Sequence, residues 1–230
     1  MDSTLKAEDR AHREILNLII QHKFSPGEII MEADLTTRLE MSRTPVRAAL
    51  GRLATEGLIE KHPGTKSYII PPVTPEDLRQ IVHVRSILES DAASEAALYA
   101  SADEKKRLLE ILAQENSYDF SQNSFDYSAF SQYFEPSQRL HFAIADICHN
   151  AYLKRFILPA YWRSQLYFYF FDSFSFLNRK KETNPIITHL EKSVEEHNRI
   201  VGVIVKGDSE GARIAMKEHI ATTMSILRPF

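Results

Sequence analysis

Residues 42–64 of the chain read SRTPVRAALGRLATEGLIEKHPG, and this stretch predicts one well-delimited helix followed by a turn. Thr44 is a candidate N-cap, and Pro45 suits the first helical position, where its missing N–H group would have no partner in any case. Gly57 suits the position just past a helix end, because the backbone there commonly takes a positive φ. The apolar residues between these ends recur at the spacing of one helix face: Val46, Ala49, Leu50 and Leu53.

The segments on either side of this helix complete a small domain. The stretch Phe24-Ser25-Pro26-Gly27 breaks a preceding helix, and Pro63-Gly64 is typical of a hairpin turn. The other predicted elements are a helix over about Ala7–His22, a short strand at Ile29–Ile30, a helix over about Ala33–Glu40, and strands over Leu58–His62 and Ser67–Ile70. Three helices and a hairpin in this order predict a winged helix-turn-helix.

A proline cluster follows the hairpin and predicts a domain boundary near residue 72. The first domain would span residues 1–72 and the second residues 73–230. Helical periods then recur over residues 75–100, 102–116, 125–149, 152–176, 185–206 and 209–227. The sequence therefore predicts a mainly α protein, in which a winged helix-turn-helix precedes an all-α bundle of six or seven helices.

Composition excludes several classes of protein. Hydrophobic residues make up 43% of the 230 residues and charged residues 26%, which is ordinary for a globular protein. No apolar run approaches the roughly 20 residues that span a bilayer, and the polar N-terminus is unlike a signal peptide. The single cysteine, Cys148, excludes an intramolecular disulfide and fits a reducing compartment. We therefore expect a cytoplasmic protein without membrane contact.

The charge of residues 41–66 indicates a nucleic-acid partner. The whole chain carries a net charge of −3, yet this segment holds five cations and two carboxylates. Cations at a helix N-terminus can reach phosphates and base edges, and arginine is the usual reader of guanine. An isolated pair of arginines would more often be a solvated helix surface, but the wing and the preceding helices favour DNA. The predicted contacts are Arg43, Thr44, Arg47 and Arg52 on the helix, with Lys61, Gly64 and Lys66 on the wing.

The run PGEIIMEADLTTRLEMSRTPVRAALGRLATEGLIEKHPG, from Pro26 to Gly64, closely resembles the DNA-binding domain of the GntR family of bacterial transcription regulators. The resemblance implies base or phosphate contacts for Arg43 and Arg47, a phosphate contact for Thr44, and the wing tip for Gly64. The wing departs from the family pattern, because PGTKSY replaces a glycine followed by a small or aromatic residue and a valine.

The second domain resembles the helical effector domain of the FadR-type (FCD) branch of that family. The resemblance is carried by VRSILESDAASEAA (84–97), LHFAIADICHNAYL (140–153) and EEHNRIVGVIVKGDSEGARIAMKEHI (195–220). Many FCD domains bind a divalent metal through three histidines and an aspartate that stands four residues before the first of them.

Three histidines of this chain are candidate metal ligands: His141, His197 and His219. If Gly207 joins two antiparallel helices, His197 and His219 lie at similar heights along the pair. Imidazoles from different helices suit Zn, Ni or Mn. Ser137 stands where the family has its aspartate, which leaves a metal-free polar pocket as the alternative.

Two arginines and Ser137 are candidate effector contacts. Arg85 and Glu89 are spaced as a helix-surface salt bridge, but the family resemblance implies that Arg85 faces the effector cavity, where a guanidinium could clamp a carboxylate. Arg163 is a candidate of the same kind. Aromatic residues cluster within 118–134 and 161–176, where they could line a pocket or a subunit interface, and they permit a hydrophobic or aromatic acid as effector.

The sequence as a whole predicts a dimeric transcription repressor that binds a palindromic operator in double-stranded DNA and responds to a small carboxylate. A metal-dependent hydrolytic enzyme that uses the three histidines is the alternative. No carboxylate base is spaced as in a hydrolase motif near these histidines, and no P-loop or nucleophile elbow appears, so we expect no enzymatic activity. An architectural DNA binder would leave the large helical domain without a role.

Overall fold

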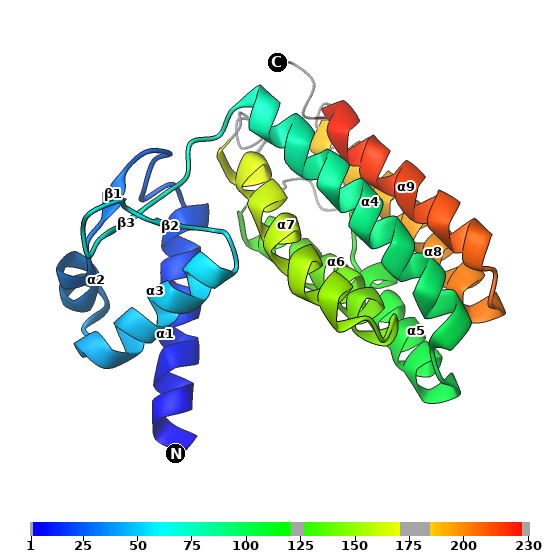
Figure 1. Cartoon of the computed structure of the whole chain (residues 1–230), viewed down its shortest axis with the longest axis horizontal. Coiled ribbons are helices and arrows are strands. Elements are labelled where there is room, and N and C mark those ends of the chain that lie inside the picture. The colour runs from blue at the N-terminus through cyan, green and yellow to red at the C-terminus, as the bar shows by residue number, and fades with distance from the viewer. Residues whose placement is uncertain (1, 121–126, 171–184, 227–230) are drawn as a thin grey trace. The chain divides into compact units, whose positions relative to one another are not determined.

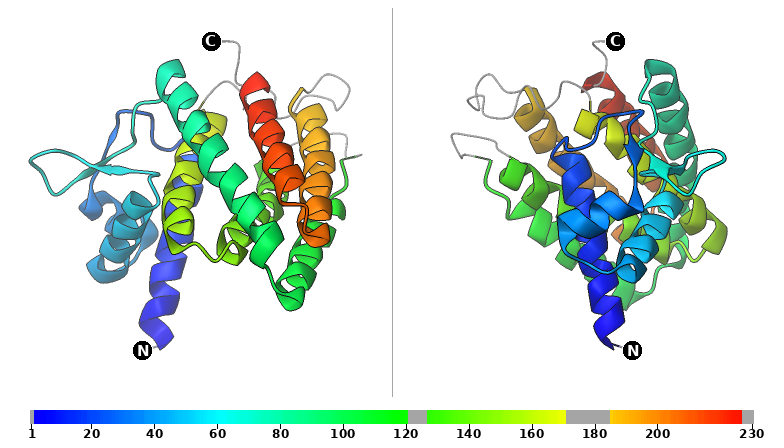
Figure 2. Two further views of the ribbon diagram at one scale, coloured as in Figure 1. Left: turned by 45° about the vertical axis from the view of Figure 1, so that its right-hand side comes forward. Right: turned by 90° about the vertical axis from the view of Figure 1, so that its left-hand side faces the viewer.

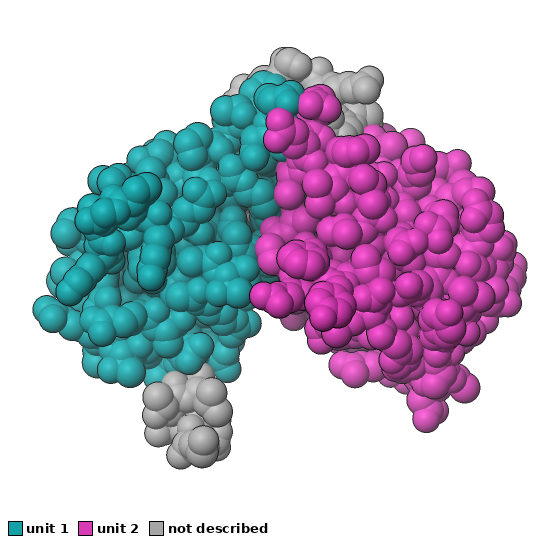
Figure 3. Space-filling view, viewed as in Figure 1, with its two compact units in different colours: residues 1–78, 161–171 teal, residues 79–160, 172–230 magenta. Residues whose placement is uncertain are grey.

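The structure is a computed structural model that describes residues 2–120, 127–170 and 185–226 (Figure 1). The protein is mainly α-helical with one small sheet, as predicted. It divides into two compact units, the first of residues 1–78 and 161–171 and the second of residues 79–160 and 172–230 (Figure 3). The first unit thus extends past the predicted linker, and the domain boundary near residue 72 stays a prediction.

The first unit contains the winged helix-turn-helix. Its elements are α1 (Asp2–Ile20), β1 (Ile29–Ile30), α2 (Glu32–Leu39), α3 (Arg43–Thr55), β2 (Glu60–Lys61) and β3 (Tyr68–Ile69). The strands form an antiparallel sheet in the order β1-β3-β2, in which Tyr68 is opposite both Ile30 and Lys61. Helices α1 and α3 pack on each other through a fully buried core of Ile15, Ile19, Val46, Leu50 and Leu53.

Helix α3 begins earlier than the sequence predicted. Ser42 is the N-cap residue, with an extended backbone at φ −68° and ψ 161°, so the assignment of Thr44 as N-cap and Pro45 as first helical residue was wrong. Pro45 is tolerated inside the first turn because the N–H groups of that turn have no intrahelical acceptor. The serine side chain makes no capping hydrogen bond to these N–H groups.

The C-terminal end of α3 follows the prediction. Gly57 takes a positive φ of 79° just past the helix. Its N–H donates to the Ala54 carbonyl at 3.2 Å, and the Leu58 N–H donates to the Leu53 carbonyl at 3.0 Å. These two bonds form a Schellman motif, and the buried side chains of Leu53 and Leu58 add the apolar residues that usually accompany it.

The helices after the wing match the predicted periods closely. They are α4 (Pro75–Tyr99), α5 (Ala102–Asn116), α6 (Tyr127–Ile147), α7 (Ala151–Phe170), α8 (Pro185–Lys206) and α9 (Ser209–Ile226). In the second unit, α8 and α9 form an antiparallel pair that Gly207 joins at φ 78°, and α5 packs on both α6 and α8 (Figure 2). None of the helices in the described ranges is long and apolar enough to cross a membrane.

The structure describes only part of the two predicted aromatic clusters. Tyr161, Trp162 and Tyr167 are buried. Residues 121–126 and 171–176, which hold several of the other aromatic residues, lie outside the described residues. A pocket or interface formed by these clusters stays a prediction.

Candidate nucleic-acid interface and metal centre

A concave surface in the first unit joins α2, α3 and the wing. Its volume is about 610 Å³, and three of the predicted DNA contacts, Arg43, Arg47 and Lys66, line it. Helix α3 presents the two arginines from its first turn and a half, while the wing supplies the lysine. Thr44 is exposed beside them at the start of α3, and Lys61 is exposed on β2. The surface is cationic and hollowed, which suits the backbone of a nucleic acid.

Arg47 forms an ion pair with Glu32 on this surface. Its Nε donates to Glu32 Oε2 and its Nη2 to Glu32 Oε1, both at 2.9 Å. This hydrogen-bonded pairing lowers the pKa of Glu32, so the carboxylate is ionised. Local sequence patterns do not predict this pair, because the two residues are 15 positions apart and on different helices.

Arg52 points towards α1 and away from this group. Its Nε donates to Glu56 and its Nη1 to Asp9, each at 3.0 Å, and Glu56 also bonds His12 at 2.6 Å. Arg52 is absent from the residues that line the concave surface. The predicted backbone contact of Arg52 stays a prediction.

The wing turn is held by its own polar groups. Gly64 takes φ 72°, a conformation that side-chain-bearing residues rarely adopt, and this φ requires glycine at the tip. The Thr65 hydroxyl donates to the His62 carbonyl at 3.1 Å and is 2.6 Å from the Ser67 hydroxyl oxygen. The turn therefore positions the neighbouring Lys66 at the edge of the concave surface.

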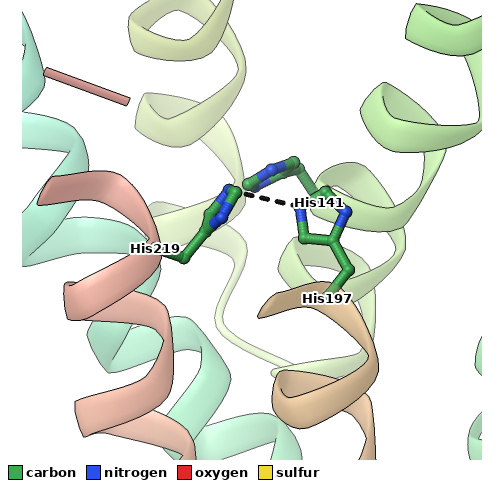
Figure 4. Close-up of side chains that lie close together, drawn as sticks. All are labelled: His141, His197 and His219. Atoms are coloured by element: carbon green, nitrogen blue, oxygen red, sulfur yellow. Dashed lines mark hydrogen bonds between the residues drawn. The ribbon is translucent and has the colours of Figure 1, made fainter. Parts of the chain in front are cut away.

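The three predicted metal-binding histidines come together in the core of the second unit. His141 of α6, His197 of α8 and His219 of α9 are buried, and one ring nitrogen of each lies within 4.8 Å of the others (Figure 4). The Nε2 atoms of His197 and His219 are 3.2 Å apart. Two nitrogen ligands of a tetrahedral or octahedral ion with bonds of about 2.1 Å are separated by a similar distance. The spacing thus fits a shared metal ion.

A different glutamate contacts the Nδ1 atom of each histidine. Glu89 of α4 lies 2.6 Å from His141, Glu115 of α5 lies 2.8 Å from His197, and Glu196 of α8 lies 2.9 Å from His219. Their spacing in the sequence matches no hydrolase motif, and sequence patterns alone did not place these carboxylates beside the histidines. The carboxylates bind the outer nitrogens, so they are not placed on the side where the rings converge.

These carboxylates determine which nitrogen of each ring carries its lone pair. When Nδ1–H donates to a carboxylate, Nε2 is the unprotonated nitrogen in the neutral ring. Burial lowers the pKa of His141 and, still further, that of His219, which favours neutral rings. The neutral imidazole is the form that binds metals. The Nε2 atoms of His197 and His219 are within hydrogen-bonding distance of each other, and a metal ion bound by both rings would take the place of that hydrogen bond.

Arg85 and Ser137 lie in the same unit as the histidines. The predicted salt bridge between Arg85 and Glu89 forms, with Arg85 Nε donating to Glu89 Oε1 at 2.6 Å, but it is buried rather than on the helix surface, since Arg85 is only 2% exposed. Burial alone would raise the pKa of Glu89, but Arg85 and His141 lower it to about 2. Ser137 is buried one turn before His141 and supplies no charge. The candidate ligand set therefore consists of three histidines, without the carboxylate that the family pattern adds.

Comparisons with known proteins identify both parts of the chain. Residues 7–69 match the family model of bacterial regulatory proteins of the gntR family, and residues 80–222 match the FCD domain. The chain is a GntR-family transcription regulator with an FCD domain. The predicted family and the DNA-binding, effector-responsive class of function are confirmed.

Relatives of this GntR regulator are similar along most of its length. The Uxu operon transcriptional regulator of Escherichia coli (strain K12) is 25% identical over 241 residues, which cover 94% of this chain and 84% of that protein. The regulator LutR of Bacillus subtilis (strain 168) is 25% identical, covering 91% and 96%. Among solved structures, Escherichia coli McbR/YncC has the same fold with a TM-score of 0.70, at 21% identity over 97% and 96% of the chains. The family, the Uxu operon regulator and LutR are transcription regulators, not enzymes, so the hydrolase alternative is set aside.

Arg163, the remaining effector candidate of the regulator, belongs to the first unit. Its Nη2 donates to Asp77 Oδ2 at 2.8 Å and to the Pro72 carbonyl at 2.9 Å. Tyr167 donates its hydroxyl hydrogen to the same Asp77 oxygen. These bonds tie α7 to the first turn of α4 and to the segment that precedes it, a role that the sequence did not suggest. Effector contact by Arg163 stays a prediction.

Proposed function

We propose that this regulator is a homodimeric, cytoplasmic repressor that releases a palindromic operator when its FCD domain binds a small carboxylate through a divalent metal. The convergence of one ring nitrogen from each of His141, His197 and His219 carries the proposal. On the DNA side, the cationic surface that Arg43, Arg47 and Lys66 line supports operator reading by α3 and phosphate contact by the wing.

Three histidines suit a borderline ion such as Zn or Ni better than Mn, because they provide nitrogen donors without a carboxylate. Such an ion, when bound, would supply open coordination positions that attract an anionic oxygen ligand. The protein's own residues do the rest: Glu89, Glu115 and Glu196 orient the rings, and the buried surroundings exclude water. A small molecule with a carboxylate is the kind of ligand that completes this shell.

An exposed apolar surface in the second unit supports dimerisation. A groove of about 490 Å³ lies between α4, α7 and α9, with Ile87, Leu153, Arg213 and Lys217 among its lining residues. Large apolar side chains on the same three helices are exposed: Val84 41%, Ile87 56%, Tyr152 73%, Phe156 55% and Ile214 43%. Contiguous exposed apolar area typically marks an interface. Its proposed occupant is a second copy of this chain, because a two-fold dimer would match a palindromic operator.

Replacing Ile87 with glutamate is expected to shift the dimer towards monomers, because a desolvated charge would oppose its burial in the interface. Sedimentation velocity over a concentration series should give a dimer dissociation constant raised at least about tenfold, which corresponds to about 1.4 kcal/mol. Leu109→Glu on α5, where the side chain is 45% exposed, is the matched control. An I87E protein that dimerises like the wild type would exclude this surface.

Operator release is the direct test of the proposed function. Fluorescence anisotropy with an operator mapped by genomic footprinting should show dissociation when the Zn- or Ni-loaded protein meets one member of a panel of small carboxylates. The same compound should raise the melting temperature of the protein without being consumed. If a compound that stabilises the protein instead tightens operator binding, the repressor assignment fails. If carboxylates act equally on metal-free protein, the metal has no part in sensing.

A further inference from the structure

The ion pair between Arg47 and Glu32 lies on the DNA-facing surface, and the stability of the fold does not explain it. The Arg47 side chain is 68% exposed, and exposed ion pairs contribute little to stability. Glu32 is less exposed, at 21%, and it is the first residue of α2. The positive end of the helix dipole holds an anion at this position. The carboxylate is therefore the less exposed partner, held at the start of α2, and Arg47 is the partner that projects further into solvent.

Glu32 is also the one acidic residue among the nine that line the concave surface in the described chain. The others include the cations Arg43, Arg47 and Lys66. A surface built only to attract DNA would gain from leaving out this negative charge, because a carboxylate repels phosphate and offsets a cation. The position of Glu32 therefore indicates that this carboxylate influences which DNA group Arg47 contacts. It does not serve to attract DNA to the surface.

The hydrogen bonds to Glu32 determine which N–H groups of Arg47 remain available to DNA. A guanidinium has five N–H donors, and Glu32 engages Nε and one hydrogen of Nη2. The edge formed by Nη1 and the second Nη2 hydrogen is left for DNA, and this edge fits the O6 and N7 acceptors of guanine. Phosphate, in contrast, would gain less from a guanidinium whose charge a carboxylate already balances. Base edges are uncharged, so the carboxylate does not repel them.

We propose that Glu32 is a specificity-determining residue, which holds Arg47 for base reading and disfavours its use as a phosphate contact. This role rests on the proposed contact between Arg47 and the operator. Glu32 lowers affinity for arbitrary DNA and widens the gap between operator and non-operator sequences.

The test compares Glu32→Gln with Asp34→Asn, which removes the same charge from an exposed position of α2 outside the concave surface. Anisotropy titrations would use the operator and a scrambled duplex of equal length at several salt concentrations. For E32Q we expect tighter binding to the scrambled duplex, a salt slope steeper by about one per protomer, and an operator preference reduced at least about fivefold. D34N should keep the wild-type preference.

The outcomes separate this role from the DNA-binding role of Arg47. If E32Q keeps the wild-type operator preference, or changes it only as D34N does, Glu32 does not determine specificity. If R47A also binds the operator like the wild type, the proposed contact of Arg47 fails as well. Circular dichroism melting of each variant would confirm that the winged domain stays folded, so that a change in preference reflects recognition.

Discussion

Replacing Arg47 with alanine is expected to abolish selective operator binding. A bidentate arginine–guanine contact contributes about 1–3 kcal/mol of discrimination, and a dimer would lose two of them, about 2–6 kcal/mol in total. Binding to non-operator DNA should persist, because Arg43 and Lys66 line the same surface and still attract phosphate. Anisotropy titrations with operator and scrambled duplexes measure the two effects separately.

Arg107→Ala provides the control for this prediction. Arg107 is an exposed arginine of α5 in the second unit, so its loss removes the same charge far along the chain from the winged domain. It should leave operator preference unchanged. An R47A protein that still prefers the operator by the wild-type factor would show that α3 reads DNA through other residues.

Replacing His197 with alanine is expected to remove stoichiometric metal binding. The wild-type protein, purified without a histidine tag and saturated with Zn or Ni, should hold one ion for each chain. Glu115→Gln should retain the site but weaken it by about 10- to 100-fold, because the partner of Nδ1 orients the ring and raises its basicity. Elemental analysis gives the stoichiometry, and competition with a chromogenic chelator gives the affinity.

The absorption of bound Co²⁺ adds a readout that loss of fold alone would not reproduce, since its visible bands report the ligand set directly. His149→Ala is the matched control, because His149 is exposed and pairs with Glu104 on the surface. Wild-type protein that takes up no ion under Zn or Ni saturation would leave the metal-free polar pocket as the explanation for the cluster.

Much of the fold followed from local sequence patterns. Apolar periods predicted α5 and α8 to the residue, and Gly57 and Gly207 marked helix ends because each takes a positive φ. The predicted start of α3 was two residues too late, because two residues near it can act as an N-cap. Ser42 and Thr44 are both suitable N-caps, and only the extended backbone at Ser42 distinguishes them. The exact first residue of a helix depends on the backbone dihedral angles of a single residue, and the local sequence determines those angles only weakly.

The sequence by itself determined the class of the protein and the histidines of its candidate metal centre. Helical spacing and the turn at Gly207 were enough to place His197 beside His219, because both are properties of one continuous stretch of chain. Only the tertiary structure decided what surrounds them. Glu89 and Glu115 reach the centre from separate helices, and Glu32 meets Arg47 across the helix-turn-helix. Contacts of this kind depend on how helices pack, and packing joins residues with no fixed separation along the chain.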